Sequence, residues 1–140
     1  MAEMVKLFVN GQEVEVESGK NLIDALKVVG IEIPHFCYHP ALGADGNCRM
    51  CLVGIEDGRP PLVPACKTPA QEGMKVLLDA EHIKKNQRDV LDFELINHPV
   101  DCPVCDQAGE CALQDYYMNY SLDDSRMRVE QVTKGKKMDF

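Results

Sequence analysis

The chain has no tryptophan, few aromatic residues and no long run of apolar side chains. No stretch approaches the roughly 20 consecutive apolar residues that a membrane-spanning helix needs. Residues 1–10 also lack a basic segment followed by an apolar one, so no export signal is visible there. We therefore expect a protein of a reducing compartment, where disulfide bonds are rare.

Positive charge is also scarce, because 15 Lys and Arg stand against 23 Asp and Glu, a formal net charge of -8. Nucleic acids demand a basic surface, so we expect no nucleic-acid partner, and we expect no direct membrane insertion. An acidic protein is suited to basic docking faces on partner subunits.

The cysteines are the main feature that is present. Seven thiols cannot all pair as disulfides within one chain. They fall into two separated sets, each built around a C-x2-C pair, and one histidine completes the second set. The sets are Cys37, Cys48, Cys51 and Cys66, and His98, Cys102, Cys105 and Cys111. Two sets of four ligands predict two metal centres.

Zinc and iron–sulfur clusters are the two alternatives for these centres. Cysteine sets with one histidine also form structural zinc sites, which would make the chain an interaction module. Zinc sites usually combine two short knuckles, whereas Cys37 and Cys66 each stand alone in the sequence. A thioredoxin-like role is disfavoured, because neither C-x2-C pair lies at the strand-to-helix junction of a βαβ unit. The spacing favours clusters.

The first part of the chain predicts a hairpin followed by a helix. Residues 5–9 and 13–16 are strand-like runs joined by Asn10-Gly11, a strong signal for a two-residue turn. Asn21 can cap a helix that Gly30 ends. This ββα order is the opening of a β-grasp fold, within an α+β class. The helix is expected at residues 22–29 and further extended segments at 51–56, 62–66 and 74–79, with a turn at Asp57-Gly58.

Residues 33–49 hold two glycines and two prolines, which predicts an irregular loop around a metal centre. Gly43 and Gly46 would let the backbone approach a buried cluster. Backbone N–H groups aimed inward would donate to its sulfurs.

A family resemblance becomes specific at residues 45–53, Asp-Gly-Asn-Cys-Arg-Met-Cys-Leu-Val. With Cys37 before and Cys66 after, they resemble the N-terminal [2Fe-2S] domain of the large iron–sulfur subunit of bacterial NADH:quinone oxidoreductase, respiratory complex I. Related domains open iron-only hydrogenases and NAD-linked formate dehydrogenases. The resemblance implies a ferredoxin-like β-grasp domain over residues 1–80 whose four cysteines hold one [2Fe-2S] cluster.

Residues 97–106, followed by Gly109-Glu110-Cys111, resemble the same family's histidine-ligated [4Fe-4S] segment. The implied ligands are His98, Cys102, Cys105 and Cys111, within a helical second region over residues 81–120. A helix is expected from residue 81 to residue 97, because Ile83, Val90, Leu91 and Leu95 recur at helical spacing, with Lys84, Lys85, Arg88 and Asp92 elsewhere. A short helix over 115–120 would close over the second cluster.

The resemblance implies an electron-transfer module without a substrate site of its own. A flavin-bearing NADH-oxidising subunit would feed electrons in, and other iron–sulfur subunits would pass them toward quinone, at the cytoplasmic face of the membrane. The same module in a hydrogenase or formate dehydrogenase is the alternative.

The family's subunit normally continues into further cysteine motifs, so we expect a truncated protein, a cleaved product or a short variant. Residues 121–140 are charged, which is typical of a solvated tail or the start of a further domain.

Overall fold

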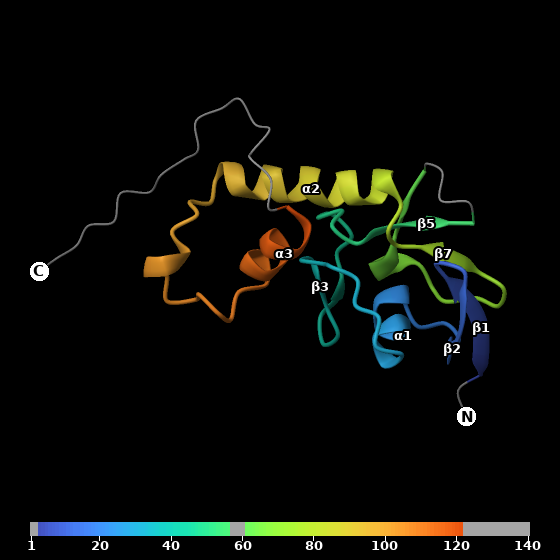
Figure 1. Cartoon of the computed structure of the whole chain (residues 1–140). Helices are drawn as coiled ribbons and strands as arrows, with labels where there is room; N and C mark the ends of the chain where they lie inside the picture. The colour runs from blue at the N-terminus through green and yellow to red at the C-terminus, as the bar shows by residue number, and fades with distance from the viewer. Residues whose placement is uncertain (1–2, 57–60, 122–140) are drawn as a thin grey trace, which may run out of the picture. The chain divides into compact units, whose positions relative to one another are not determined.

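The computed structural model describes residues 3–56 and 61–121 of the chain (Figure 1). It divides into two compact units, Met1–Gln87 and Arg88–Phe140, and the division falls inside one helix. Among the described residues, no helix combines the length and the apolar character needed to cross a bilayer. The expected boundaries at residues 80 and 120 stay predictions, and the expected tail after Ser121 lies outside the described residues.

The first unit opens with the predicted hairpin. Strand β1 (Met4–Val9) pairs antiparallel with β2 (Gln12–Glu17), and Val9 faces Gln12 across the turn. Asn10 and Gly11 have φ angles of 49° and 84°. Positive φ at both central residues is the requirement of the tight hairpin turn that Asn-Gly signals, so this prediction is confirmed.

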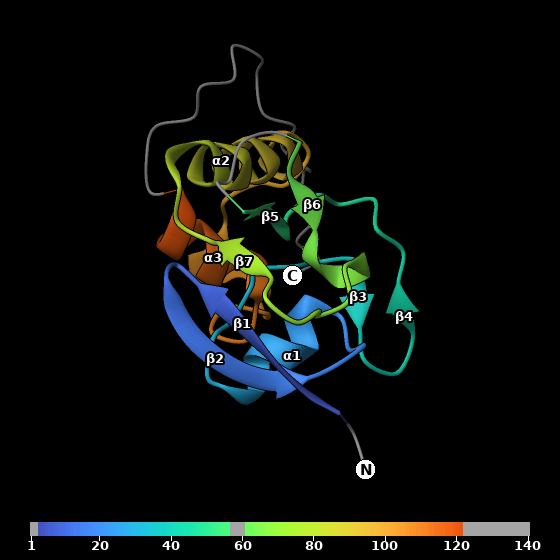
Figure 2. The same cartoon turned by 90° about the vertical axis from the view of Figure 1, so that its right-hand side faces the viewer.

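The hairpin forms one side of a five-stranded sheet with the order β2-β1-β7-β5-β6. The last strand among the described residues, β7 (Lys75–Leu77), lies in the middle of the sheet, parallel to β1 and antiparallel to β5 (Leu52–Ile55). The edge strand β6 is Val63–Pro64. Figure 2 shows β1 and β2 as a long twisted ribbon beside β7. The inserted central strand joins the two halves of the unit into one sheet.

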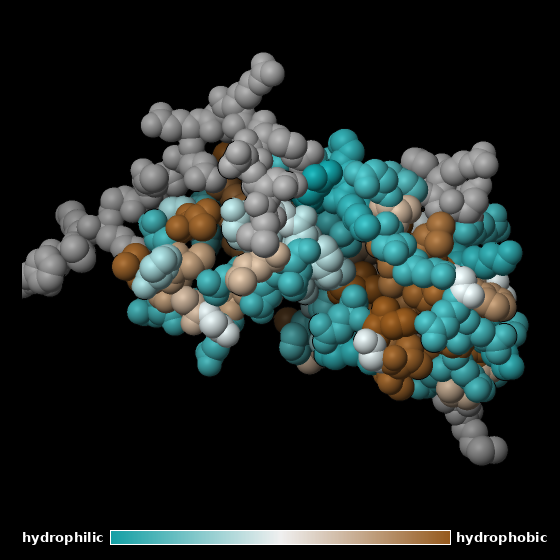
Figure 3. Space-filling model, in the orientation of Figure 1, coloured by the Kyte–Doolittle hydropathy of each residue, from teal (hydrophilic) through white to brown (hydrophobic). Residues whose placement is uncertain are grey.

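Helix α1 (Leu22–Val28) packs its apolar side into the core beneath this sheet (Figure 2). Asn21 caps it as predicted, since its Oδ1 accepts a hydrogen bond from the Asp24 N–H at 3.0 Å. Gly30, with a φ of 82°, follows the helix end. The core residues with the least exposure include Leu7, Leu22, Leu26, Val53 and Val76. Figure 3 shows hydrophobic surface over the part of the molecule that contains α1. Val28, the last residue of α1, and Val29, which follows it, have exposed apolar side chains.

Three expectations for the first unit need correction or lie outside the structure. The loop at residues 33–49 contains a two-strand ribbon, β3 (Tyr38–His39) and β4 (Gly43–Ala44), because Gly43 has the positive φ that reverses the chain. Residues 65–67 form the 3-10 helix η1 (Ala65–Lys67), so the extended segment ends before Cys66. The expected turn at Asp57-Gly58 lies outside the described residues.

The predicted second helix is present as α2 (Glu81–Ile96), one residue shorter than expected. Ile83, Leu91 and Leu95 are buried as its periodicity requires, whereas Val90, expected on the same side, is half-buried. Asp92 was expected away from this side, but it is buried with an exposure of 8%, because a helix position beside Leu91 and Leu95 is partly covered too. The second unit continues with the 3-10 helix η2 (Cys102–Val104) and with α3 (Ala112–Tyr120), which begins earlier than the predicted helix over 115–120.

Candidate metal centres

The first ligand set comes from three different parts of the first unit. Cys37 directly precedes β3, Cys48 and Cys51 lie in the turn that leads into β5, and Cys66 lies in η1. The four thiols differ in burial: Cys51 is 1% exposed and Cys66 4% exposed, whereas Cys37 and Cys48 are half-buried. One side of the site is therefore made by the protein core and the other by a surface loop.

The loop between the paired cysteines has an unusual backbone. Arg49 has a φ of 59°, a left-handed conformation that turns the chain between Cys48 and Cys51. The Asn86 side chain, from α2, donates a hydrogen bond to the Arg49 carbonyl at 2.9 Å. Across from this turn, the Cys51 carbonyl accepts a hydrogen bond from the Ala65 N–H at 3.1 Å. These bonds connect the pair to α2 and to the start of η1, next to Cys66.

Backbone N–H groups surround the Cys37 sulfur, as expected for a cluster-binding loop. The Cys48 N–H lies 3.5 Å from Cys37 Sγ. Burial would raise the pKa of the Cys37 thiol, but donation from the N–H groups of Cys48, Gly46 and Asn47 outweighs it and lowers that pKa. The loop is thus arranged to stabilise a thiolate at this position.

The pKa of Cys66 shifts in the opposite direction to that of Cys37. Burial, followed by its hydrogen bond with Cys51 and the charges of Cys51, Cys37 and Cys48, raises the pKa of Cys66 to about 12. A pKa shift with these causes requires that all four sulfurs of the set lie near one another. It also means that metal binding must release a proton from Cys66, since metals bind the thiolate.

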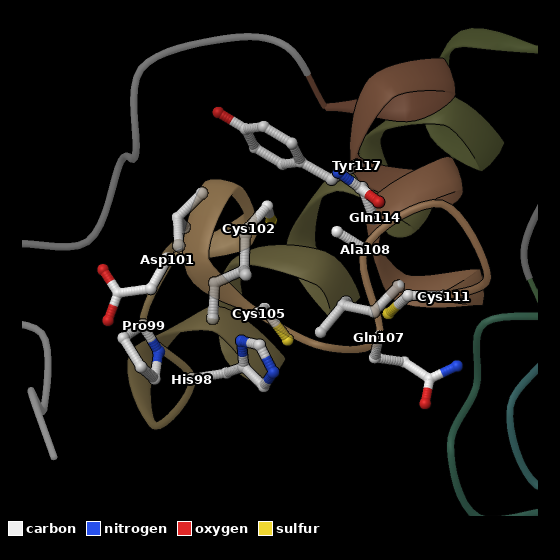
Figure 4. Close-up of a pocket in the computed structure, with 13 residues that line it drawn as sticks. His98, Pro99, Asp101, Cys102, Cys105, Gln107, Ala108, Cys111, Gln114 and Tyr117 are labelled. Atoms are coloured by element: carbon white, nitrogen blue, oxygen red, sulfur yellow. The ribbon is translucent and has the colours of Figure 1, made fainter. Parts of the chain in front are cut away.

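The second ligand set gathers around one cavity of the second unit. The cavity has a volume of about 230 Å³. A cavity of roughly 150 Å³ accepts a benzene molecule, so this hollow has room for more than a single ion. Figure 4 shows His98 beside Cys105, with Cys111 on the segment that leads into α3. All four predicted ligands line it, together with Leu95, Pro99, Val100, Asp101, Gln107, Ala108, Leu113, Gln114 and Tyr117.

Within the described residues, the hydrogen bonds around the second set join residues that are close in sequence. Gln114 on α3 accepts one from the Gly109 N–H at 3.0 Å, and Gln107 donates one to the Glu110 carbonyl at 2.9 Å. His98 and Cys105 are exposed, and the other two cysteines are half-buried. Within the described residues, no three His, Cys, Asp or Glu side chains are grouped tightly enough to hold one metal ion. The structure thus brings the members of each set to one place.

Several residues that support the sites were not identified from the sequence. Tyr38, next to Cys37, donates its hydroxyl proton to the Asp24 carboxylate, and Asn86 and Gln114 bind loop backbone groups. Burial, followed by the hydrogen bond to Asp24, raises the pKa of Tyr38. No spacing rule points to these residues, because their partners are distant in sequence or are main-chain atoms.

Comparison with known proteins places both sites in context. Residues 2–81 match the 2Fe-2S iron-sulfur cluster binding domain, and residues 87–126 match the NADH-ubiquinone oxidoreductase-G iron-sulfur binding region. The first match covers more than half of the chain, so the chain belongs to the family of 2Fe-2S iron–sulfur cluster binding domains.

The relatives agree with these matches. The NADH-ubiquinone oxidoreductase 75 kDa subunit of Reclinomonas americana is 50% identical over 123 residues, 88% of this chain and 18% of that protein. The mitochondrial NADH dehydrogenase [ubiquinone] iron-sulfur protein 1 of Solanum tuberosum is 44% identical over 124 residues, 89% of this chain and 17% of that protein. The chain thus spans less than a fifth of the length of these relatives.

A solved structure is similar as well. The crystal structure of an NAD+-reducing [NiFe]-hydrogenase in the H2-reduced state has a TM-score of 0.79 and 26% identity, over 94% of this chain and 55% of that one. The ferredoxin-like fold expected from the sequence is confirmed.

The cofactors follow from the two matched regions, which are one [2Fe-2S] cluster and one [4Fe-4S] cluster. Of the two alternatives raised by the sequence, the matches therefore support iron–sulfur clusters and not zinc. Both donor sets fit this chemistry, since thiolates and one imidazole are cluster ligands and the N–H groups at Cys37 suit an anionic sulfur. The assignment of individual ligands remains a prediction from spacing.

Proposed function

We propose that the chain is an electron-transfer module that passes single electrons through its two clusters within an NADH:quinone oxidoreductase of the complex I type. The observation that carries the proposal is the presence of two iron–sulfur regions in one chain, each with its ligand set gathered at one place. Cys37, Cys48, Cys51 and Cys66 would hold the [2Fe-2S] cluster, and His98, Cys102, Cys105 and Cys111 the [4Fe-4S] cluster.

The clusters supply reversible one-electron chemistry, and the chain supplies their surroundings. The core behind Cys51 and Cys66 excludes water from one side of the first site. The N–H groups around Cys37 stabilise negative charge at its sulfur. Exposure of His98 and Cys105 leaves the second site open to a neighbouring protein. In this way the protein determines how easily each cluster accepts an electron and from which side.

The partners would be a flavin-bearing NADH-oxidising subunit and other iron–sulfur subunits of the same complex. The names of the relatives support membership in such a complex. The net charge of -8 suits basic docking surfaces on these subunits. We place the module on the cytoplasmic side of the membrane, peripheral to it and attached through its partners.

A second candidate is the same electron-transfer role in an NAD-linked hydrogenase. The structural similarity to an NAD+-reducing [NiFe]-hydrogenase favours it. The two candidates share both clusters and differ in the electron donor. Identities of 44–50% with the oxidoreductase subunits, against 26% with the hydrogenase, favour the first.

The first test is the content of iron, acid-labile sulfide and zinc in protein purified without oxygen. We expect about six irons and six sulfides per chain, the sum of one [2Fe-2S] and one [4Fe-4S] cluster. Two zinc ions without sulfide would overturn the electron-transfer proposal. Reconstitution with a flavin-bearing NADH-oxidising subunit would then test the donor: NADH should bleach the visible absorbance of both clusters. Bleaching by H2 with a hydrogenase, but not by NADH, would favour the second candidate.

A further inference from the structure

The four ligands of the first site are not equally fixed by local sequence. Cys48 and Cys51 belong to one short turn, so the chain itself keeps them close. Cys37 and Cys66 are distant in sequence from this pair and from each other. A cluster needs these two sulfurs at a fixed separation, and therefore some contact must connect the segment after Cys37 with the segment that carries Cys66.

Tyr38 connects the Cys37 side to the start of helix α1. Its hydroxyl donates a hydrogen bond to Oδ2 of Asp24. The Asn21 side-chain amide donates to the same carboxylate oxygen at 3.1 Å and to the Tyr38 hydroxyl oxygen at 3.2 Å. The Tyr38 side chain is buried, and its ring packs edge-on against His35 at a centroid distance of 5.6 Å. We call Asn21, Asp24 and Tyr38 the α1 network.

The same turn of α1 connects to the Cys66 side through the main chain. The Leu22 N–H donates to the Thr68 carbonyl at 2.9 Å, and Asn21 forms an isolated β-bridge with Pro69. Thr68 in turn donates its hydroxyl proton to the Pro64 carbonyl at 2.9 Å, across η1. The first turn of α1 is thus bonded to the residue after Cys37 and to residues just beyond Cys66.

We infer that the α1 network positions Cys37 relative to Cys66 and so shapes the [2Fe-2S] centre. The inference rests on the proposed function, because it takes these cysteines as ligands. Asn21, Asp24 and Tyr38 act here as positioning residues, through the segments that carry the sulfurs.

Helix capping alone does not account for this arrangement. The cap needs only Oδ1 of Asn21, which accepts from the Asp24 N–H. The Asn21 amide group and the Asp24 carboxylate are free of that task, and both are directed to Tyr38. Replacement of Asn21 by serine separates the two roles, since a serine hydroxyl still caps the helix but has no amide to donate.

The test compares Tyr38→Phe, Asn21→Ser, Asp24→Ala and Asp24→Asn in the full chain with both clusters bound. We expect an altered electron paramagnetic resonance spectrum of the reduced [2Fe-2S] cluster and loss of this cluster to a chelator about tenfold faster, the factor for one hydrogen bond to a charged group. Asp24→Asn keeps an acceptor for Tyr38, so it should restore part of what Asp24→Ala loses. The [4Fe-4S] signal should not change.

Two controls separate positioning from general destabilisation. Tyr120→Phe makes the same chemical change in α3 and should leave the [2Fe-2S] spectrum unaltered. Leu26→Ala opens a cavity in the same core and removes none of the side-chain hydrogen bonds of the α1 network. If Leu26→Ala alters the spectrum or speeds cluster loss as much as Tyr38→Phe does, the inference is overturned.

A variant that purifies without the [2Fe-2S] cluster also decides the question. It supports the inference if Leu26→Ala, at equal or lower thermal stability, retains the cluster, and opposes it if Leu26→Ala loses the cluster too. Unchanged spectra and loss rates in all four variants would overturn the inference alone. Absence of any [2Fe-2S] signal in the unaltered protein would instead overturn the proposed function.

Discussion

The two ligand sets of this chain are held in different ways. In the first unit, the cysteines are attached to a sheet, a helix and a hydrophobic core, and two of the thiols are almost completely buried. In the second unit, the predicted ligands lie on a short segment between α2 and α3 that is mostly exposed and whose described hydrogen bonds join residues close in sequence. We therefore expect the first site to keep its shape without a cluster and the second to depend on its cluster for shape.

This difference affects the expected order of events when the clusters bind. A site supported by a core keeps its shape before the metal arrives, while a loop that gains its contacts from the metal couples binding to folding. Side chains that line the cavity of about 230 Å³ in the second unit have few packing partners on the cavity side unless a cluster fills it. Experiments that remove the clusters, single ligands or single supporting side chains can measure how far the two sites differ.

Removal of both clusters should have the largest effect, and it should fall mainly on the second unit. Binding of a structural metal contributes on the order of 10 kcal/mol to folding of the segment that it organises. In the cluster-free protein, we expect hydrogen exchange to remain slow in β1, α1 and β7 and to become fast over residues 98–111. Equal loss of protection in both units would show that the first core also requires its cluster.

Replacement of single ligands should separate the two clusters. Cys66→Ala should remove about two irons and Cys105→Ala about four, because the two cysteines are predicted to bind different clusters. Iron and sulfide content, with the resonance spectrum of the remaining cluster, is the measurement. Loss of both clusters from either variant would contradict the independence of the two sites.

Leu26→Ala should weaken the first unit by about 2–5 kcal/mol, because Leu26 is fully buried in its core. Denaturant unfolding followed by far-ultraviolet circular dichroism measures the loss. The exposed Leu42→Ala is the matched control, with an exposure of 88% at position 42. A similar loss in both variants would argue against the core described above.

Asn86→Ala should cost about 1 kcal/mol, the usual net value of one hydrogen bond. It removes the donor to the Arg49 carbonyl, in the turn between two ligands of the first cluster. We therefore expect slightly faster loss of the [2Fe-2S] cluster to a chelator and no change in the [4Fe-4S] cluster. Lys84→Ala, on an exposed part of α2, serves as control and should behave as the unaltered protein.

Gly46→Ala should have a similarly small effect, about 1 kcal/mol, from the left-handed backbone with a φ of 83°. The new Cβ would lie 2.6 Å from Lys67 Cε, but the end of that flexible side chain can move away at small cost. Gly43→Ala has the same φ and no neighbour within 4 Å, so it isolates the strain. If Gly46→Ala costs several times more than Gly43→Ala, then Lys67 is held more firmly than its exposure suggests.

Much of the local structure could be predicted from the sequence. Asn10-Gly11 predicted the turn, Asn21 the helix cap, and the spacing of Ile83, Leu91 and Leu95 the side of α2 that is buried. These features depend on residues close in sequence, where backbone conformation and side-chain periodicity are determined by a few neighbours. The C-x2-C pairs belong to the same class, because short spacing alone keeps two ligands together.

Features that depend on distant partners could not be predicted in this way. The sequence of residues 75–77 predicts a strand, but many pairings with the other strands would satisfy that pattern. Their central position between β1 and β5 is therefore a property of the tertiary structure. The 3-10 conformation at Cys66 and the burial of Asp92 likewise follow from packing. Tyr38 was merely the residue after Cys37 until the fold placed its hydroxyl against Asp24.

The sequence by itself determined which residues can bind metal, how they group into two sets, and the family to which the motifs belong. Only the tertiary structure decided that the first set is supported by a core and by the first turn of α1, while the second lines an exposed hollow. The physical reason is that ligand identity and spacing are properties of the chain. Burial and long-range hydrogen bonds arise only when segments far apart in the chain meet.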